Sequence, residues 1–422
     1  MSNNDDFMKD LQSSLAEEVN DELGSEGDSN RMAGSKKNKK KNKHTGLKVF
    51  LGILIAITAC AAFLVLTPMG RRVLVGWMAE YAYSVIDKNN NEINTASAGS
   101  SFADDGLNGA DISQATTNID ESQMSDTYRN AMHEDGVYNI LLLGVEAIDS
   151  SEESGHTDSV MVFTINTNTN ELGLTSIMRD TYVSVPGEQY YDTRINGVYR
   201  QGGIELMYET IAENFGLKLD GCAIVGFEAF QKVVDAVGGI DIKLTKEEAH
   251  YLNHTNYISE KKYRIMKTGW NHMNGNQALG YCRIRKIATL HGTKDDQGRT
   301  ARHRRVINAI YKKVKKDPTK VIGVMNNVLP LVKTDIRKQN ATAYMAGVLE
   351  LALAGKTLDQ LRLPEGQPDG TEYKYSVING ADMVEVTDWP TLKTNFLNFV
   401  FNPHPVKTSG TTMTRSGNVT SD

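Results

Sequence analysis

The chain has 422 residues and a formal net charge of −6, and 40% of its residues are hydrophobic while 23% are charged. At ~100–200 residues per domain this length allows two or three folded units. The acidic balance argues against a dedicated nucleic-acid binder, and the three cysteines are too few for a disulfide framework or a four-cysteine zinc site.

The N-terminal part has the pattern of a single membrane anchor. Residues 1–46 are predicted to form a disordered cytoplasmic tail, and six lysines lie between Lys36 and Lys43. The 19 residues from Val49 to Thr67 carry no charge, and as a helix they would span roughly 28 Å, close to a hydrocarbon core.

We therefore place a transmembrane helix at residues 47–68. Because lysines stay on the cytoplasmic side, we expect a single-pass signal-anchor protein of the cell membrane with its N-terminus inside the cell. A cleaved signal peptide is the alternative, but the long charged segment before the span is atypical of one.

The rest of the chain is predicted to lie outside the membrane. Residues 69–135 read as a juxtamembrane helix followed by a spacer rich in Asn, Ser, Thr, Asp, Ala and Gly. Residues 136–402 are predicted to form one extracytoplasmic domain, and residues 403–422 a disordered tail.

Strand and helix patterns alternate within this domain. Strands are predicted at residues 138–146, 159–166, 171–177, 222–227, 240–244 and 373–378. Helices are predicted at residues 202–216, 228–239, 274–280, 299–316, 319–331, 341–354 and 391–400. This order predicts an α/β fold, an α+β sandwich in which helices flank a central mixed sheet.

Acidic residues stand at two of the predicted strand ends. Glu146 ends the first strand, and Asp158 lies just before the second. Two carboxylates at adjacent strand edges suit Mg²⁺ or Mn²⁺ with substrate phosphates, whereas a pair of acids that cap loops is the alternative.

Arginines gather in the same connections. Arg179 follows the third strand, Arg283 and Arg285 alternate as if on one face of an extended segment, and Arg299 opens a basic helix. Guanidinium groups bind phosphate bidentately, so these residues suggest a diphosphate site, although a solvated basic face is the alternative.

No sequence motif for a protein nucleophile is present. Cys222 and Cys282 are predicted to lie inside apolar strands, as core residues. Phosphoryl transfer assisted by a metal and arginines needs no such nucleophile, because an acceptor hydroxyl can attack directly.

The domain resembles the LytR-CpsA-Psr family over residues 137–316, and the segment to about residue 402 resembles the C-terminal part of longer members. The motifs that carry the resemblance are YNILLLGVE, HTDSVMVFTIN, LGLTSIMRDTYVSVPG, RINGVYRQGG, FEAFQKVVDAVGGIDI, MNGNQALGYCRIRK and DDQGRTARHRRV.

The resemblance implies a metal-dependent phosphotransferase that moves wall teichoic acid or capsular polysaccharide from a polyprenyl-diphosphate carrier onto peptidoglycan. It implies that membrane lipid is a partner and nucleic acid is not, and that the lipid tail enters an apolar pocket between the sheet and its helices. A non-catalytic polyprenyl-phosphate-binding regulator and a diphosphate hydrolase are the alternatives.

The resemblance also implies roles for individual residues. Asp158, with Glu146, would bind Mg²⁺ or Mn²⁺. Catalytic contacts to the diphosphate are expected from Arg179, Arg283, Arg285 and Arg299. Substrate contacts are expected from Arg194, Asn196, Arg302 and His303.

This sequence departs from the family pattern at two of these positions. Glu146 stands where members have aspartate, and His303 stands where they have glutamine. Because a small misplacement of a catalytic group can cost ~10²-fold in rate, both departures leave reduced activity open.

Overall fold

The computed structural model describes Val73, Trp77, Ile119 and residues 121–145, 157–328, 331–336 and 338–401. The predicted cytoplasmic tail, the predicted span at 47–68, most of the spacer, Glu146 and the C-terminal tail lie outside these residues. Among the residues that are described, no helix is both long enough and apolar enough to cross a membrane.

A mixed sheet forms the centre of the described domain. Its strands lie in the order β10-β3-β2-β1-β6-β9. Their bounds are β1 Val137–Gly144, β2 Ser159–Asn166, β3 Glu171–Ile177, β6 Gly221–Val225, β9 Val332–Thr334 and β10 Leu358–Leu363. β2 pairs antiparallel with β1 and β3, whereas β6 runs parallel to β1 and β10 runs parallel to β3.

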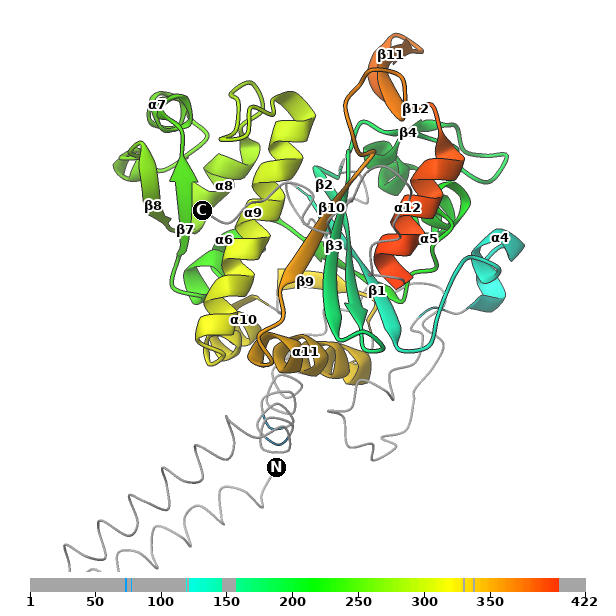
Figure 1. Cartoon of the computed structure of the whole chain (residues 1–422), viewed down its shortest axis with the longest axis horizontal. Coiled ribbons are helices and arrows are strands. Elements are labelled where there is room, and N and C mark those ends of the chain that lie inside the picture. The colour runs from blue at the N-terminus through cyan, green and yellow to red at the C-terminus, as the bar shows by residue number, and fades with distance from the viewer. Residues whose placement is uncertain are drawn as a thin grey trace, which may run out of the picture. The chain divides into compact units, whose positions relative to one another are not determined.

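Helices cover both faces of this sheet because its strands are apolar on both sides. On one face, Leu141 and Leu143 belong to a buried cluster with residues of α4, α5 and α12, whereas Ile140 on the other face packs with residues of α9 and α11 (Figure 1). The bounds are α4 Asp126–Arg129, α5 Val198–Phe215, α9 Asp295–Lys316, α11 Lys338–Leu353 and α12 Trp389–Phe401.

A separate apolar cluster lies beside the sheet. It is built from α6 (Phe227–Ala236), α7 (Lys246–His254), α8 (Gly275–Arg283) and the antiparallel pair β7 (Ile240–Leu244) and β8 (Gly269–Met273), which pack against one side of α9. α10 (Lys320–Val328) follows α9 along the chain. Helix α9 therefore links this cluster to the central sheet.

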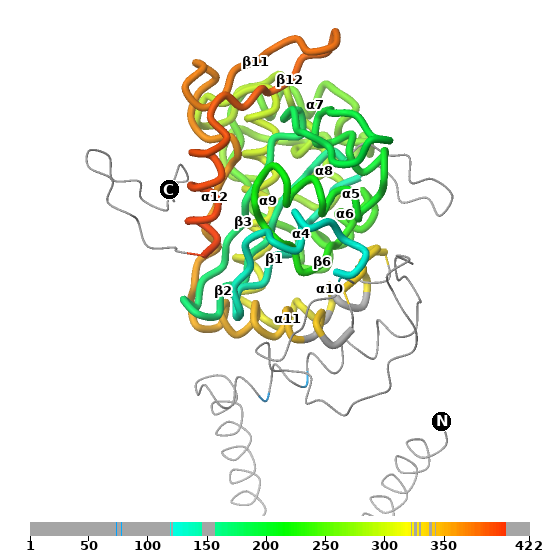
Figure 2. Tube along the Cα trace, turned by 90° about the vertical axis from the view of Figure 1, so that its right-hand side faces the viewer, coloured from blue at the N-terminus to red at the C-terminus, as the bar shows by residue number. Residues whose placement is uncertain are grey.

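Two short strand pairs lie near the site described below. They are β4 (Tyr182–Val183) with β5 (Thr193–Arg194), and β11 (Tyr373–Ile378) with β12 (Ala381–Val386). Figure 2 shows the β11–β12 hairpin near one end of α12, while α11 lies near the opposite end of the sheet.

The predicted mixed sheet flanked by helices is confirmed, and the predicted bounds agree with those of β2, β3, β7 and β11. The sequence prediction omitted α7 and the strands β4, β5, β8, β9, β10 and β12. Cys222 and Cys282 are buried and free, as expected of core residues, but Cys282 lies in α8 and not in a strand.

Candidate active site

Two adjacent strands bring the first pair of charges together. Val160 of β2 pairs with Ile177 of β3, so Asp158, just before β2, lies at the same sheet edge as Arg179, just after β3. The Arg179 Nη1 donates to Asp158 Oδ1 at 2.8 Å. The Asp158 backbone N–H donates to the Gly144 carbonyl at 2.7 Å, which fixes the aspartate against the end of β1.

The first turn of α9 adds a second pair to the same place. Arg299 Nη1 lies 3.8 Å from Asp158 Oδ1, and Arg179 Nε lies 3.7 Å from Asp296 Oδ1. Arg299 Nη2 also donates to Asp296 Oδ1. Each of these two arginines thus contacts both aspartates.

Asp180 extends this group toward solvent. Its Oδ1 lies 3.4 Å from Arg194 Nη1 and 3.6 Å from Arg179 Nε, and its Oδ2 lies 4.0 Å from Arg285 Nη2. We call the full set the arginine–aspartate cluster; it consists of Asp158, Arg179, Asp180, Arg194, Arg285, Asp296 and Arg299. Four arginines against three aspartates leave it with an excess of positive charge.

Asn196 ties the loops of the cluster together through its backbone. Its N–H donates to the Arg179 carbonyl, and its own carbonyl accepts from Thr157 N–H, both at 3.1 Å. Asn196 is buried. Its backbone hydrogen bonds hold together the segments that carry Asp158 and Arg179.

The cluster is buried at α9 and open at its rim. Asp296 and Arg299 are buried, whereas the side chain of Arg285 is 45% exposed and that of Asp158 is 39% exposed. Burial raises the pKa of Asp296, against the opposing effect of Arg299, and burial lowers the pKa of Arg299, against the opposing effect of Asp296.

Two polar atoms at the buried end lack a hydrogen-bond partner among the described residues. They are Arg179 Nε and Asp296 Oδ2. Such atoms are normally paired in folded proteins, so a pair of them at one place indicates a position for a ligand, an ion or water.

The hollow at this place is small. It measures about 10 Å³ and is lined by Asp158, Arg179, Asp296, Arg299 and His303 over an apolar floor of Val160 and Ile177. This is about the ~10–15 Å³ that one water requires, so a larger anion must displace some of the ion pairs.

Comparison with known proteins assigns the chain to a family. The model of the LytR_cpsA_psr family matches residues 106–389, which is more than half of the chain. The chain belongs to the LytR_cpsA_psr family.

Two curated family relatives are transferases by name. The chain is 29% identical over 203 residues to the Bacillus subtilis polyisoprenyl-teichoic acid–peptidoglycan teichoic acid transferase TagV, covering 47% of this chain and 50% of TagV. It is 33% identical over 175 residues to TagU of Bacillus anthracis, a transferase of the same name, covering 42% and 52%. The matches thus span about half the length of these relatives.

Solved structures agree on the LytR_cpsA_psr fold. A Streptococcus agalactiae protein of known structure matches with a TM-score of 0.51 at 23% identity, covering 63% of this chain and 86% of that one. The crystal structure of B. subtilis TagV matches with a TM-score of 0.50 at 23% identity, covering 64% and 100%.

Not every residue expected from the family motifs lies in the cluster. Arg283 ends α8, and its guanidinium lies over the rings of Phe227 and Tyr257 at 5.5 and 5.4 Å. The expected extended segment carrying both Arg283 and Arg285 is therefore wrong, because the helix continues to Arg283 and only Arg285 contacts Asp180.

Arg302 is placed differently from the expectation. Its side chain is fully buried, its Nε donates to Glu248 Oε1 at 3.0 Å, and its Nη1 donates to the Ile284 carbonyl at 3.0 Å. Its Nη2 donates to the Ile287 carbonyl at 2.6 Å. These contacts give Arg302 a structural role in place of the expected substrate contact.

His303 lies at the small hollow and is uncharged. Burial lowers its pKa to about 3, and its Nε2 is 3.0 Å from the Cys282 carbonyl. Because a carbonyl only accepts, this nitrogen carries the proton.

Sequence reasoning did not select Asp180 or Asp296 as site residues. Asp180 directly follows Arg179, and Asp296 stands three residues before Arg299, the spacing of neighbours on one helix face. That spacing was the available signal for Asp296. Glu146 lies outside the described residues, and within them no three His, Cys, Asp or Glu side chains converge on a metal position.

Proposed function

We propose that this chain transfers a glycopolymer from a polyprenyl-diphosphate carrier onto peptidoglycan, with the arginine–aspartate cluster as its catalytic centre. The convergence of four arginines on three aspartates at one sheet edge carries the proposal. The names of the TagU and TagV relatives support the same substrate classes.

The cluster suits a diphosphate. Planar guanidinium groups donate bidentately to phosphate oxygens, and the partial burial of Arg179 and Arg299 strengthens their interaction with an anion. A diphosphate that enters replaces aspartate oxygens as the acceptors of these donors. The acceptor hydroxyl of peptidoglycan then attacks the glycan-bearing phosphorus and gives its proton to solvent. The bond from this phosphorus to the bridging oxygen breaks, polyprenyl phosphate leaves, and the arginines stabilise the charge that develops.

We infer that Asp158 and Asp296 hold Mg²⁺ or Mn²⁺, with Glu146 as a further candidate. Both described carboxylates contact the same two guanidiniums, and Asp296 Oδ2 has no partner among the described residues, so hard oxygen donors are available there. When bound there, the ion would supply positive charge and Lewis acidity to the phosphates.

The proposed cellular arrangement rests on the sequence. The uncharged segment 49–67 anchors the chain, the lysines of residues 36–43 stay in the cytoplasm, and residues 136–402 act outside the membrane. In this arrangement both the lipid carrier and peptidoglycan reach the cluster.

The test uses the purified full chain in detergent with a polyprenyl-diphosphate glycan, peptidoglycan fragments and either Mg²⁺ or a chelator. Metal-dependent release of polyprenyl phosphate together with a glycan–peptidoglycan adduct is the expected result. Release without an adduct would instead show hydrolysis, and lipid binding without turnover would show a binding protein.

A further inference from the structure

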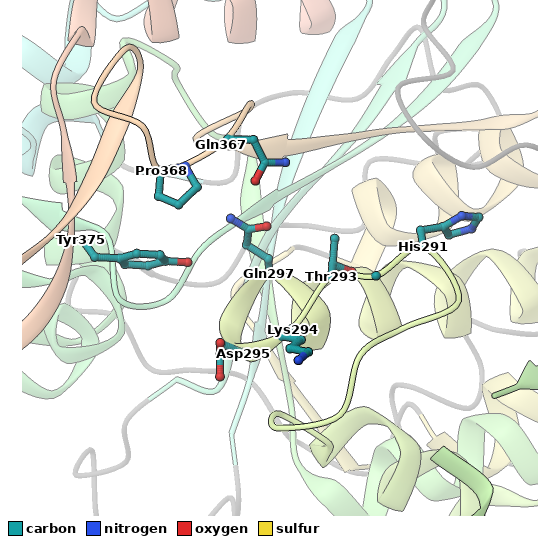
Figure 3. A pocket seen from close by; sticks show the side chains of 9 residues that line it. His291, Thr293, Lys294, Asp295, Gln297, Gln367, Pro368 and Tyr375 are labelled. Atoms are coloured by element: carbon teal, nitrogen blue, oxygen red, sulfur yellow. The ribbon is translucent and has the colours of Figure 1, made fainter. Parts of the chain in front are cut away.

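A second hollow lies beside the arginine–aspartate cluster and is much larger. It measures about 320 Å³ and lies between the segment that leads into α9, the connection from β10 to β11, and β11 itself (Figure 3). Gln297 lines this cleft, and its chain neighbour Asp296 lines the small hollow of the cluster. The two hollows are therefore neighbours along the first turn of α9.

The cleft has one aromatic wall and many polar groups. Tyr375 of β11 is 51% exposed, and its hydroxyl points toward Gln297, while Gln367 and Thr293 lie on other sides of Gln297 (Figure 3). The buried Tyr373 packs against Tyr375, and the two rings meet edge-on with their centroids 6.1 Å apart. Gln297 Nε2 donates a hydrogen bond to the hydroxyl of Tyr373.

The lining groups select among ligand classes. Lys294 and Asp295 offset each other in charge, so the cleft lacks the positive excess that would favour a polyanion. Its walls are too polar for a lipid tail. Amide groups that both donate and accept, beside an exposed aromatic face, suit hydroxyl groups and the apolar face of a sugar ring.

The size of the cleft agrees with this class of ligand. A volume of about 320 Å³ is at the lower end of small-molecule pockets, which measure ~300–1,000 Å³. It has room for a short stretch of a glycan and not for a whole polymer.

We propose that this cleft is an oligosaccharide subsite that holds a sugar of the glycan beside the diphosphate-binding cluster. The inference rests on the proposed transfer. The sugar belongs either to the donor, next to its diphosphate, or to the peptidoglycan acceptor. Both offer sugar hydroxyl groups and ring faces to such a cleft.

The wall that carries Tyr375 is fixed to the cluster. Val384 of β12 donates its N–H to the Asp180 carbonyl at 2.8 Å, and Thr181 forms an isolated bridge with Val384. Because β12 pairs with β11, a sugar against Tyr375 keeps a constant relation to Asp180 and its arginines.

The test measures binding and turnover separately with the full chain in detergent. Binding of β-1,4-linked N-acetylglucosamine tetrasaccharide and of a diphosphate-free donor glycan is followed by titration. The steady-state KM for donor and acceptor is measured for wild type, Tyr375→Ala and Gln297→Ala. Val377→Ala is the control, because Val377 lies on the same strand, is 70% exposed and does not line the cleft.

We expect Tyr375→Ala to weaken binding of one of the two saccharides roughly tenfold, which corresponds to about 1.4 kcal/mol, and to raise the KM of the matching substrate similarly. Val377→Ala should behave as wild type. A change confined to the tetrasaccharide assigns the subsite to the acceptor, and a change confined to the donor glycan assigns it to the donor.

The failures of the two proposals are distinguishable. If the chain binds saccharide through Tyr375 but shows no transferase turnover, the subsite proposal stands and the proposed function is rejected. Normal turnover with unchanged binding and unchanged KM values in Tyr375→Ala and Gln297→Ala would overturn the subsite and keep the function.

Discussion

Arg179 connects the three aspartates of the cluster. Its Nη1 donates to Asp158 at 2.8 Å, and its Nε lies 3.6 Å from Asp180 and 3.7 Å from Asp296. Only a planar group with several fixed donors reaches three carboxylates at once, and a phosphate that replaces an aspartate meets the same donors.

We therefore expect Arg179→Lys to lower the rate of transfer by about 10²-fold or more, the usual effect of losing one donor to a charged transition state. Arg285→Lys is the matched control, because Arg285 is more exposed and lies 4.0 Å from Asp180. Its transfer rate should fall only a few-fold. Equal rates for the two lysine variants would show that Arg179 supplies only general positive charge.

His303 gives a prediction about stability and pH. Burial lowers its pKa to about 3 in the folded chain, whereas an unfolded histidine titrates near ~6.5. Above pH ~6.5 the residue is neutral in both states. As the pH falls from ~6.5 to ~3, only the unfolded chain gains this proton, so unfolding becomes more favourable.

His303→Gln removes this contribution. Below pH 6 the free energy of unfolding of wild type should fall relative to that of the variant, by up to about 1.4 kcal/mol per pH unit. Urea denaturation of both proteins between pH 7.5 and 4.5 measures the difference. A constant difference across this range would contradict a neutral, partly buried His303.

The residues of the site were partly predictable. Asp158 and Arg179 are predictable because they flank adjacent strands, one before β2 and the other after β3, and the structure joins them directly. Arg302 was not separable from Arg299 by sequence, since both open the same basic helix. Its burial depends on α7, which supplies Glu248 from a distant part of the sequence.

At the scale of elements, the pair of Glu248 and Arg302 joins α7 to α9. Both side chains are fully buried, and Glu248 also completes the capping box of α7 with Thr245. Loss of one partner leaves an uncompensated buried charge, which typically costs about 3–5 kcal/mol.

Glu248→Ala should therefore lower the free energy of unfolding by about 3–5 kcal/mol. The double variant Glu248→Leu with Arg302→Met should recover most of this loss in the free energy of unfolding. About 1 kcal/mol should remain lost, because leucine cannot complete the capping box of α7. Urea denaturation of the single and double variants completes the cycle. A loss below about 1 kcal/mol in Glu248→Ala would show that the pair is not needed to join the helices.

Helices and strands with a clear hydrophobic pattern were predictable from the sequence. Elements that form only through pairing with another part of the chain were harder to predict. β2 (SVMVFTIN) is mostly apolar and β3 (ELGLTSI) is almost fully buried, with a turn between them where Asn170 adopts a φ of 56°. β10 reads LDQLRL and was missed, because its identity as a strand depends on parallel pairing with β3. α7 was missed although Thr245 and Glu248 carry the spacing of a capping box.

For the whole molecule, the C-terminal part completes the fold of the motif-bearing core. β10 lies at one end of the central sheet, and Leu363 together with Leu392, Phe396 and Val400 belongs to the main buried cluster on one of its faces. Residues 137–316 by themselves therefore do not cover this face of the sheet.

A chain that ends at residue 357 should lose cooperative unfolding, since the apolar partners of α5 and β2 are removed. Thermal unfolding and limited proteolysis of the truncated and full chains measure this effect. A truncated chain that unfolds cooperatively at the temperature of the full chain would show that the motif core is an independent domain.

We propose that the arginine–aspartate cluster performs the transfer. Its most direct test is the single-turnover rate of glycan transfer by wild type, Asp158→Ala and Asp296→Asn over a range of Mg²⁺ concentrations. Asp126→Ala is the control, because Asp126 forms an exposed pair with Arg129 at the same i, i+3 spacing as Asp296 with Arg299.

We expect both cluster variants to lose transfer by about 10²-fold or more while they stay folded, and Asp126→Ala to retain the wild-type rate. Transfer at the wild-type rate by a well-folded Asp158→Ala variant would contradict this proposal.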